Sequence, residues 1–366
     1  MQITIIAGAR PNFMKIAPII DAIRAKQSEG IDIHYRLVHT GQHYDKKMSG
    51  DFFEQLGIPE PDANLEAGGG TQAEQTAAIM IRFEKELLEN PSDLVLVVGD
   101  VTSTMACTIT AQKLHTKVAH VEAGIRSGDW SMPEEINRLV TDSITNYFFT
   151  TTEFANESLR KSGIEENRIF FVGNTMIDTL LKHRPRFQRP HVWHELDLQE
   201  GGYIVMTLHR PANVDQEAKL KALMGEIIDN SANLPLVFPV HPRTAKMLTQ
   251  LGIEHPRLHM IEPLGYLEFN YLVERAKVVI TDSGGITEET SVMKVPCITL
   301  RDNTERPETV TLGTNELVGT DPRAIKPALQ TLFSGEWKVG GEIPLWDGKT
   351  AERIVNHIIK LYQTDD

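Results

Sequence analysis

Apolar, β-branched runs alternate with stretches of helical, amphipathic periodicity along almost the whole chain. In the first half, the apolar runs predict strands at residues 3–7, 35–39, 94–98, 118–121, 147–150 and 169–172. Helical patterns lie between them at residues 13–26, 72–89, 103–114 and 133–146. Such alternation is typical of a parallel sheet that helices cover on both faces.

The alternation stops at a basic, proline-containing segment, residues 182–191, which we interpret as a linker. It then restarts, with strands predicted at residues 203–208, 236–240, 258–261, 278–281 and 297–300, and helices at 217–230, 286–293 and 350–362. We therefore predict an α/β protein with two doubly wound, Rossmann-like domains, residues 1–180 and 191–349, and a C-terminal helix within 350–366.

Unusual polar clusters follow the predicted strands. They are Gly8–Pro11, His39–His43, Gly99–Asp100, Glu122–Gly124, His209–Arg210, His241–Arg243 and Asp282–Gly285. In open α/β sheets, ligands bind beyond the carboxyl ends of the strands. We expect the two sets of clusters to face each other across a cleft between the domains, because both are needed for one site.

Composition narrows the class of protein. The chain has 366 residues, 41% of them hydrophobic, and 37 Lys and Arg against 50 Asp and Glu, for a net charge of −13. This acidic balance argues against nucleic acid or an anionic membrane as a partner. Only two cysteines occur, Cys107 and Cys297, without metal or redox spacing, which favours a cytoplasmic protein. No signal peptide or membrane span is expected, since the longest aliphatic run is residues 94–98.

Several common motifs are absent. No G-x-G-x-x-G follows a predicted strand, no H-E-x-x-H occurs, and Ser283 lacks the preceding glycine of a nucleophile elbow. Gly348, Lys349 and Thr350 resemble the end of a P-loop without its first glycine. We expect neither a metal nor a cofactor.

The second domain carries features suited to an anion. Ser283, Gly284 and Gly285 open a predicted helix, where backbone N–H groups attract phosphate, and Glu289 is placed to hold a ribose diol. An ordinary turn, with glutamates that offset the helix dipole, is the alternative. The pairs His209–Arg210 and His241–Arg243 also suit anion recognition, as do Arg10 and Lys15 in the first domain.

The first domain carries carboxylates instead. Asp100 and Glu122 each end an apolar run, where a carboxylate is costly unless it is paired or lies in a cleft. Two carboxylates on one edge suit acid/base chemistry, although Asp100 could instead cap the helix that starts near Ser103. Ser131 and Glu134 fit a capping box, which is the simpler interpretation of Glu134. These residues leave isomerase, glycosyltransferase and hydrolase open.

The ordered set of motifs resembles the non-hydrolysing UDP-N-acetylglucosamine 2-epimerases, in particular their archaeal-like branch. It runs through GARPNFMKIAP, HTGQHYD, VVGDVTST, HVEAGIRSGDWSMPEEINR, TLHRPANVD, PVHPRT, EPLGYLEF, TDSGGITEE and RDNTERPETV. The resemblance implies the two-Rossmann-domain GT-B fold, with the C-terminal helix packed back on the first domain. It also implies a homodimer without a cofactor, and a role in surface polysaccharide synthesis.

The resemblance further implies a reaction in which UDP is eliminated across C1–C2 of the sugar to give 2-acetamidoglucal and then added back. Asp100 and Glu122 would be the main acid/base residues, with Glu134, His209 and Lys15 beside the sugar. The residues that would bind the substrate, besides these, are Arg10, His241, Leu264, Phe269, Ser283, Gly284, Gly285, Glu289 and Arg306.

The sequence departs from the family pattern in places. Asn12 stands where a glutamate is common, and Leu264 where glutamine often sits. Gln42, His43 and Arg210 match a regulatory second substrate site, although Pro211 replaces its second arginine. Other segments are similar to the branch that acts on UDP-2,3-diacetamido-glucuronate. That substrate, a hydrolysing epimerase, a GT-B glycosyltransferase and an inactive UDP-sugar sensor are the alternatives.

Overall fold

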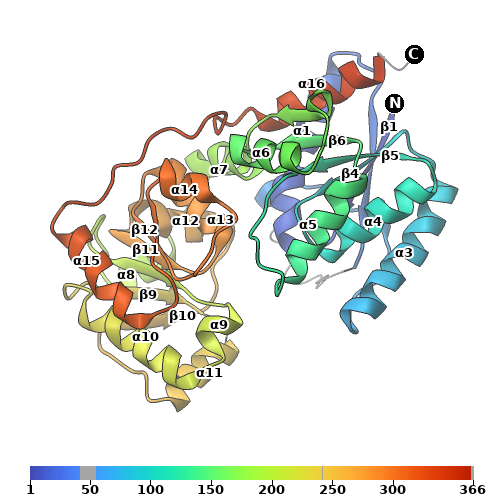
Figure 1. The fold of residues 1–366 in the computed structure, drawn as a ribbon. Helices are drawn as coiled ribbons and strands as arrows, with labels where there is room; N and C mark the ends of the chain where they lie inside the picture. Colours follow the sequence, from blue (N-terminus) through green and yellow to red (C-terminus); the bar gives the residue numbers. More distant parts are fainter. Residues whose placement is uncertain (42–54, 241, 364–366) are drawn as a thin grey trace. The chain divides into compact units, whose positions relative to one another are not determined.

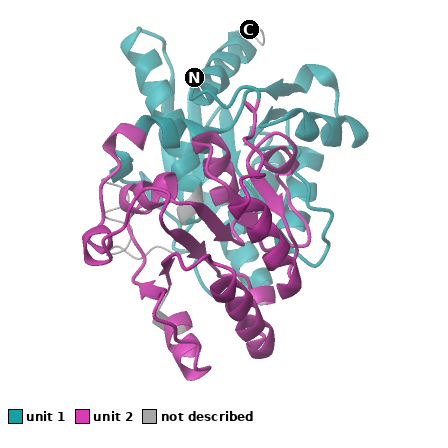
Figure 2. Ribbon diagram, turned by 90° about the vertical axis from the view of Figure 1, so that its left-hand side faces the viewer, with its two compact units in different colours: residues 1–182, 344–366 teal, residues 183–343 magenta. Residues whose placement is uncertain are grey.

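The computed structural model describes residues 1–41, 55–240 and 242–363, which divide into two compact units (Figure 2). Unit 1 comprises Met1–Lys182 together with Pro344–Asp366, and unit 2 comprises His183–Ile343. The end of the chain therefore belongs to the same unit as its start.

Unit 1 is built on a seven-stranded sheet of order β3-β2-β1-β4-β5-β6-β7, in which every described pairing is parallel. The strands are β1 (Gln2–Ala7), β2 (His34–His39), β3 (Ala63–Asn64), β4 (Leu94–Val98), β5 (Lys117–Val121), β6 (Tyr147–Thr150) and β7 (Ile169–Phe171). All five residues of β4, LVLVV, are buried, as expected for a central strand that helices cover on both faces.

The helices of unit 1 lie on both faces of this sheet (Figure 1). They are α1 (Arg10–Ser28), α3 (Gln72–Glu89), α4 (Thr102–Lys113), α5 (Pro133–Ile144), α6 (Glu153–Lys161), α7 (Thr175–His183) and α16 (Thr350–Gln363), with a 3-10 turn at Glu166–Arg168. Because the connections β1 to β2 and β4 to β5 cross the sheet in opposite directions, their right-handed crossovers put α1 and α4 on opposite faces.

The C-terminal helix α16 packs beside α1, at the opposite end of the chain. Its first turn is anchored by Asp178 of α7, whose carboxylate accepts hydrogen bonds from Thr350 N at 3.1 Å and Ala351 N at 2.7 Å. Ile354, Val355 and Ile358 on one face of the helix are buried. This confirms the predicted return of the C-terminal helix to the first domain.

Unit 2 is built on a six-stranded parallel sheet of order β10-β9-β8-β11-β12-β13. Its strands are β8 (Ile204–Thr207), β9 (Leu236–Pro239), β10 (Leu258–Ile261), β11 (Val278–Thr281), β12 (Cys297–Thr299) and β13 (Asn315–Leu317). Its helices are α8 (His191–Glu195), α9 (Pro211–Val214), α10 (Glu217–Asp229), α11 (Pro242–Gln250), α12 (Tyr266–Arg275), α13 (Gly284–Met293), α14 (Pro307–Thr311) and α15 (Ile325–Phe333), with 3-10 turns at Arg184–Arg186 and Pro322–Ala324. The α/β fold class predicted from the alternation is confirmed.

The basic segment interpreted as a linker is bound to unit 2 along much of its length. Arg184 pairs with Glu274 of α12 at 2.6 Å, and Arg189 donates to the Tyr271 hydroxyl at 2.9 Å. The Arg189 guanidinium also lies 5.6 Å from the centre of the Trp193 ring. The interpretation as a plain linker is therefore incomplete, because its cations have carboxylate and aromatic partners.

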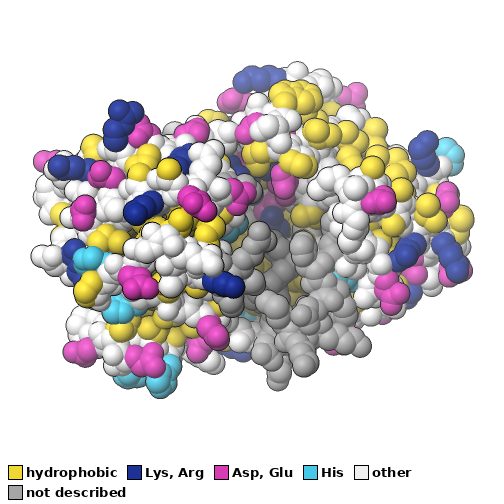
Figure 3. Space-filling view, turned by 90° about the horizontal axis from the view of Figure 1, so that it is seen from below, with side chains coloured by type: hydrophobic (Ala, Val, Ile, Leu, Met, Phe, Trp, Pro, Cys, Tyr) yellow, Lys and Arg dark blue, Asp and Glu magenta, His cyan; other side chains and the backbone are white. Residues whose placement is uncertain are grey.

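No helix among the described residues is both long and apolar enough to cross a bilayer. On the face drawn in Figure 3, acidic and basic side chains of the described residues are interspersed and form no patch of a single sign.

Candidate active site

Three polar turns of unit 1 lie at the same edge of its sheet. They follow β1, β4 and β5, which are neighbouring parallel strands, so their carboxyl ends meet. The turn after β4 carries Asp100, the turn after β5 carries Glu122, and the helix after β1 carries Lys15. The structure thus brings three of the predicted residues to one edge.

Glu122 is the most constrained of them. It is 4% exposed and has a positive φ of 68°, an uncommon conformation for a residue with a side chain. Its carboxylate forms an ion pair with the Lys15 ammonium at 2.5 Å. Gly99 lies against this pair with φ of 72°, and a Cβ added there would lie 3.3 Å from Lys15 Nζ and 3.6 Å from Glu122 Oε2. Glycine suits this position because its φ is positive and an added Cβ would crowd the Lys15 ammonium.

Asn12 holds these turns together. Its side-chain oxygen accepts hydrogen bonds from Gly8 N at 3.2 Å and Ala9 N at 2.9 Å, and its amide donates to Val98 O at 3.0 Å. The amide therefore joins the turn after β1 to the end of β4. Both a donor and an acceptor are required, which asparagine provides and an ionised glutamate does not.

Asp100 does not cap α4, which has Val101 at its N-cap and no side-chain cap. Its carboxylate pairs instead with Arg138 of α5, at 2.5 Å from Nη2 and 3.1 Å from Nε, and its carbonyl accepts from Asn137 Nδ2 at 2.9 Å. Arg138 is buried, whereas the Asp100 side chain is 31% exposed. The carboxylate is held in place and still reaches solvent.

The predicted capping box at Glu134 is wrong. Helix α5 starts at Pro133, its N-cap is Met132, and no side-chain cap is present. The Ser131 hydroxyl donates to Asp129 at 2.6 Å instead. The structural interpretation of Glu134 thus loses its support, and Glu134 remains half-buried in the first turn of α5.

The neighbouring Glu135 takes the structural role. It is buried and accepts hydrogen bonds from Ser127 N at 2.9 Å, Gly128 N at 3.0 Å and Arg138 Nη1 at 2.8 Å. Burial raises the pKa of this carboxyl, but the hydrogen bonds outweigh it and leave the pKa below the ordinary value. Glu135 and Arg138 were not among the predicted site residues, although both lie in the PEEINR motif.

In unit 2, the turns after β8 and β11 meet through Asp282. This fully buried carboxylate accepts from His209 N at 3.1 Å, Arg210 N at 2.9 Å and Asn213 Nδ2 at 3.1 Å, and lies 2.7 Å from His209 Nδ1. Burial raises its pKa, but the His209 contact and the other hydrogen bonds lower it below the ordinary value. The His209 ring is thereby oriented by Asp282 while its side chain stays 62% exposed.

Arg210, predicted as a regulatory residue, is also engaged within this unit. Its Nε donates to Asp282 O at 3.0 Å, and its Nη2 lies 3.8 Å from Glu305. Glu305 in turn pairs with Arg301 at 2.7 Å, and although burial opposes ionisation, the Arg301 contact brings the Glu305 pKa down to about 2.

The start of α13 presents backbone N–H groups. Ser283 is its N-cap and makes no side-chain cap bond, and the half-buried Gly284 and Gly285 form the first turn. An added Cβ at Gly284 would lie 3.7 Å from an Arg301 nitrogen. Such a turn beside a guanidinium can bind a phosphate group.

Further along α13, two neighbouring glutamates have different partners. Glu288 forms an ion pair with Arg306, one of the predicted substrate-binding residues. Glu289 is buried and accepts from the Tyr266 hydroxyl at 2.8 Å. Burial and the nearby Glu288 raise the Glu289 pKa to about 7. Near neutral pH, Glu289 can therefore both donate and accept hydrogen bonds.

The remaining predicted residues are placed as follows. Leu264 is half-buried in the loop before α12, and Phe269 is half-buried on α12. Arg10 is the first residue of α1. Gln42, His43 and His241 lie outside the described residues.

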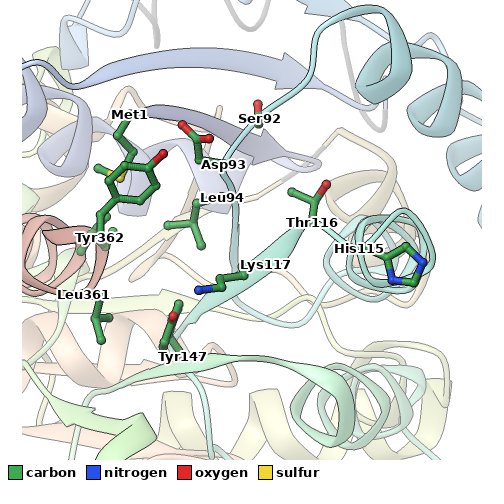
Figure 4. A pocket seen from close by; sticks show the side chains of 11 residues that line it. Met1, Ser92, Asp93, Leu94, His115, Thr116, Lys117, Tyr147, Leu361 and Tyr362 are labelled. Atoms are coloured by element: carbon green, nitrogen blue, oxygen red, sulfur yellow. The ribbon is translucent and has the colours of Figure 1, made fainter. Parts of the chain in front are cut away.

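A cavity of about 380 Å³ lies at the amino ends of the strands of the unit 1 sheet, whereas the candidate site lies at their carboxyl ends (Figure 4). Leu94 and Lys117, the first residues of β4 and β5, line it together with Tyr147 and, from α16, Leu361 and Tyr362. None of the predicted site residues lines this cavity. The candidate site and this cavity are therefore separate features of unit 1.

The family model described as UDP-N-acetylglucosamine 2-epimerase matches residues 25–359. A UDP-N-acetylglucosamine 2-epimerase of Methanocaldococcus jannaschii is 42% identical over 97% of this chain and 98% of its own length. A UDP-2,3-diacetamido-2,3-dideoxy-D-glucuronate 2-epimerase of Pseudomonas aeruginosa is 38% identical over 99% of this chain and 100% of its own.

The fold agrees with these similarities. The crystal structure of Methanocaldococcus jannaschii UDP-GlcNAc 2-epimerase, in complex with UDP-GlcNAc and UDP, matches with a TM-score of 0.87 at 41% identity. The match covers 98% of this chain and 100% of that one. Family, sequence and fold agree over nearly the whole length, and the chain belongs to the UDP-N-acetylglucosamine 2-epimerase family of isomerases.

Proposed function

We propose that this isomerase interconverts UDP-N-acetylglucosamine and UDP-N-acetylmannosamine. The observation that carries the proposal is the edge of unit 1 where Asp100 and Glu122 follow neighbouring strands, each paired with a cation. The relative from Methanocaldococcus jannaschii, whose structure contains UDP-GlcNAc and UDP, supports this choice of substrate. We further propose that the protein acts in the cytoplasm as a homodimer and supplies surface polysaccharide synthesis.

The chemistry of the sugar sets what the carboxylates must do. The C2 hydrogen is not next to a carbonyl and is too weakly acidic for direct exchange. In the proposed reaction a base removes this proton as the C1–O bond breaks, so that UDP leaves and 2-acetamidoglucal forms. A proton then returns to C2 on the other face while a UDP oxygen rebonds to C1. Each face of the sugar therefore needs an acid/base group.

We assign Asp100 and Glu122 to these two roles. Glu122 accepts a hydrogen bond from the Lys15 ammonium, which holds this carboxylate in place. Arg138 holds Asp100 with two nitrogens and leaves part of the carboxylate exposed. Glu134 and His209 are assigned supporting roles, and positive charge at Lys15 stabilises the departing anion.

Unit 2 is proposed to hold UDP. The N–H groups of Ser283, Gly284 and Gly285 at the start of α13 suit a phosphate. Glu289, with its pKa of about 7, suits the ribose hydroxyls because it can exchange donor and acceptor roles. Leu264 and Phe269 are assigned to the uracil, and Arg10, His209, His241 and Arg306 to the diphosphate.

The experiment is proton NMR of UDP-N-acetylglucosamine incubated with the protein in D₂O. We expect a new anomeric signal from UDP-N-acetylmannosamine, deuterium at C2, and little free UDP. Release of UDP and free N-acetylmannosamine, with no epimeric nucleotide sugar, would instead identify a hydrolysing enzyme. If neither occurs, the substrate assignment is wrong.

A second substrate has a specific observation in its favour, namely the similarity to the Pseudomonas aeruginosa enzyme. The same assay with UDP-2,3-diacetamido-2,3-dideoxy-glucuronate compares the two sugars directly. The larger kcat/KM identifies the preferred one. A glycosyltransferase would leave both sugars unchanged without an acceptor.

A further inference from the structure

A buried charge cluster lies behind the two carboxylate turns of unit 1. His120 of β5 is 1% exposed, and its Nδ1 lies 2.7 Å from Asp142 Oδ1 on α5. Its Nε2 lies 2.8 Å from the carbonyl oxygen of Gly99. Asp142 is also buried, and Arg126 pairs with it at 2.6 Å. None of these three ionisable groups has a part in the reaction proposed above.

The partners of His120 determine where its protons are. A carbonyl oxygen only accepts hydrogen bonds, so Nε2 carries a proton toward Gly99. Burial opposes ionisation of Asp142, but His120 and Arg126 outweigh this effect and hold its pKa below the ordinary value. The His120 ring therefore lies between two hydrogen-bonding partners, the Gly99 carbonyl oxygen and the Asp142 carboxylate.

Hydrogen bonds join the cluster to both of the turns that carry the acid/base residues. The Gly99 carbonyl, which His120 holds, belongs to the peptide group that joins Gly99 to Asp100. Asp142 Oδ2 accepts from Gly124 N at 3.0 Å, two residues after Glu122. The same helix, α5, carries Asp142 and the Arg138 that pairs with Asp100. One rigid element thus fixes both turns.

We propose that His120 is a positioning residue for the epimerisation, because its hydrogen bonds set the place of Asp100 relative to Glu122. This inference rests on the proposed function. A buried ion pair that only filled the core is often replaced by apolar residues at no cost in stability. Here its hydrogen bonds point to the two turns, where a shift of about 1 Å can cost on the order of 10²-fold in rate.

Two substitutions of His120 each keep one of the two hydrogen bonds of the ring and remove the other. In His120→Asn the amide nitrogen stands near the position of Nδ1, so it keeps the bond to Asp142 and loses the bond to Gly99. In His120→Gln the amide nitrogen reaches the position of Nε2 and keeps the bond to Gly99. We expect kcat to fall by about 10- to 100-fold in His120→Asn with KM within about twofold. His120→Gln should retain more of kcat, as a partial rescue.

The matched control is His357→Asn. His357 lies on α16 in the same unit and packs on Phe170, with ring centres 4.8 Å apart. It contacts neither turn in any described hydrogen bond. Its substitution should lower the thermal midpoint and leave kcat unchanged. Variants are compared at a temperature where each is fully folded by circular dichroism.

A second measurement does not depend on activity. Nitrogen-15 NMR of the histidine rings in the wild-type protein should show a proton on Nε2 of His120, because the Gly99 carbonyl oxygen can only accept a hydrogen bond. A ring whose Nε2 carries no proton contradicts the inference. So does a kcat within twofold of wild type in both His120 variants. If the wild type converts neither sugar, the proposed function itself is wrong, and the role of His120 in it falls as well.

Discussion

Asp100 and Asp282 occupy equivalent places in the two sheets and are used in opposite ways. Each follows the strand that lies next to the first strand of its unit, β4 beside β1 and β11 beside β8. Asp282 is fully buried and binds the two turns of unit 2 together through its carboxylate. The Asp100 side chain is 31% exposed, although Arg138 holds it.

The difference lies in what fixes the backbone. In unit 2 the carboxylate itself accepts the backbone N–H groups, so its oxygens are occupied. In unit 1 the carbonyls on either side of Asp100 are held by other side chains, Gly99 O by His120 and Asp100 O by Asn137. Asp100 is thereby relieved of a structural role. A carboxylate used for proton transfer needs this arrangement, because it must reach its substrate.

The largest expected effect tests the proposed role of Asp100 in proton transfer. Asp100→Asn keeps the shape of the side chain and removes its charge, so we expect kcat to fall by about 10²- to 10⁴-fold with little change in stability. Glu122→Gln should lower kcat similarly, and it should also lower stability, because it removes the charge of the buried partner of Lys15. Turnover is measured by the NMR assay and stability by urea denaturation. Near-normal turnover in both variants would remove the acid/base assignment.

The structural side is tested by Asp282→Asn. The amide can accept at one oxygen only, so some of the N–H groups of His209, Arg210 and Asn213 lose their acceptor in a buried site. Breaking such a buried charged contact costs about 3 kcal/mol or more of unfolding free energy. Urea denaturation measures the loss. The exposed pair Asp321–Arg323 offers a control, since Asp321→Asn should change stability by no more than about 0.5 kcal/mol.

The pH dependence of stability tests the same comparison at Glu289, a buried carboxylate of unit 2. Its pKa in the folded protein is about 7, against 4.5 for the ordinary carboxyl. The folded state keeps this proton longer than the unfolded state, so stability is full below about pH 4.5 and is lost as pH rises to about 7. The loss amounts to about 3 kcal/mol at most.

Glu289→Gln removes this dependence. Urea denaturation at about pH 5 and about pH 8 should show that the variant loses less stability than the wild type between the two values. The Tyr266 hydroxyl keeps a partner in the variant, because the amide oxygen accepts. Equal losses in both proteins would show that Glu289 does not retain its proton in the folded state.

Hydrophobic patterning predicted the strands that carry the site. Every predicted strand overlaps an observed one, and the helix at residues 72–89 coincides with α3. The pattern missed β3 and β13 because they have only two and three residues, of which only Asn315 is buried. Patterning works where burial is continuous and fails at short edge strands.

The site itself was predictable only in part. Asp100 and Glu122 stood out because a carboxylate after an apolar run has no local explanation. Glu135 did not, because an acidic residue in the first turn of a helix has a common local explanation, and Arg138 did not, because nothing in its local sequence indicates a partner. Glu134 was matched to a capping box that starts one residue too early, since the N-cap of α5 is Met132 and not Ser131. Long-range pairs such as Arg138 with Asp100 depend on tertiary structure.

The smallest expected effect concerns Asp178, a carboxylate in unit 1 that binds backbone as Asp282 does. It accepts from Thr350 N and Ala351 N, and burial raises its pKa to about 6 despite these bonds. Asp178→Asn leaves one acceptor for two N–H groups, so the start of α16 should fray at a cost of about 1 kcal/mol.

Hydrogen exchange measures where this loss falls. Amides of α16 should exchange faster in Asp178→Asn, while those of α10 in unit 2 keep their protection. Asp347→Asn is the control, because Asp347 pairs with Arg353 of the same helix from a partly exposed position, and its effect should stay within about 0.5 kcal/mol. If α16 keeps its protection in Asp178→Asn, the apolar face of the helix alone anchors it. In that case, neither Asp100 nor Asp178 of unit 1 would fix the backbone as Asp282 does in unit 2. The two units would then differ more than the structure suggests.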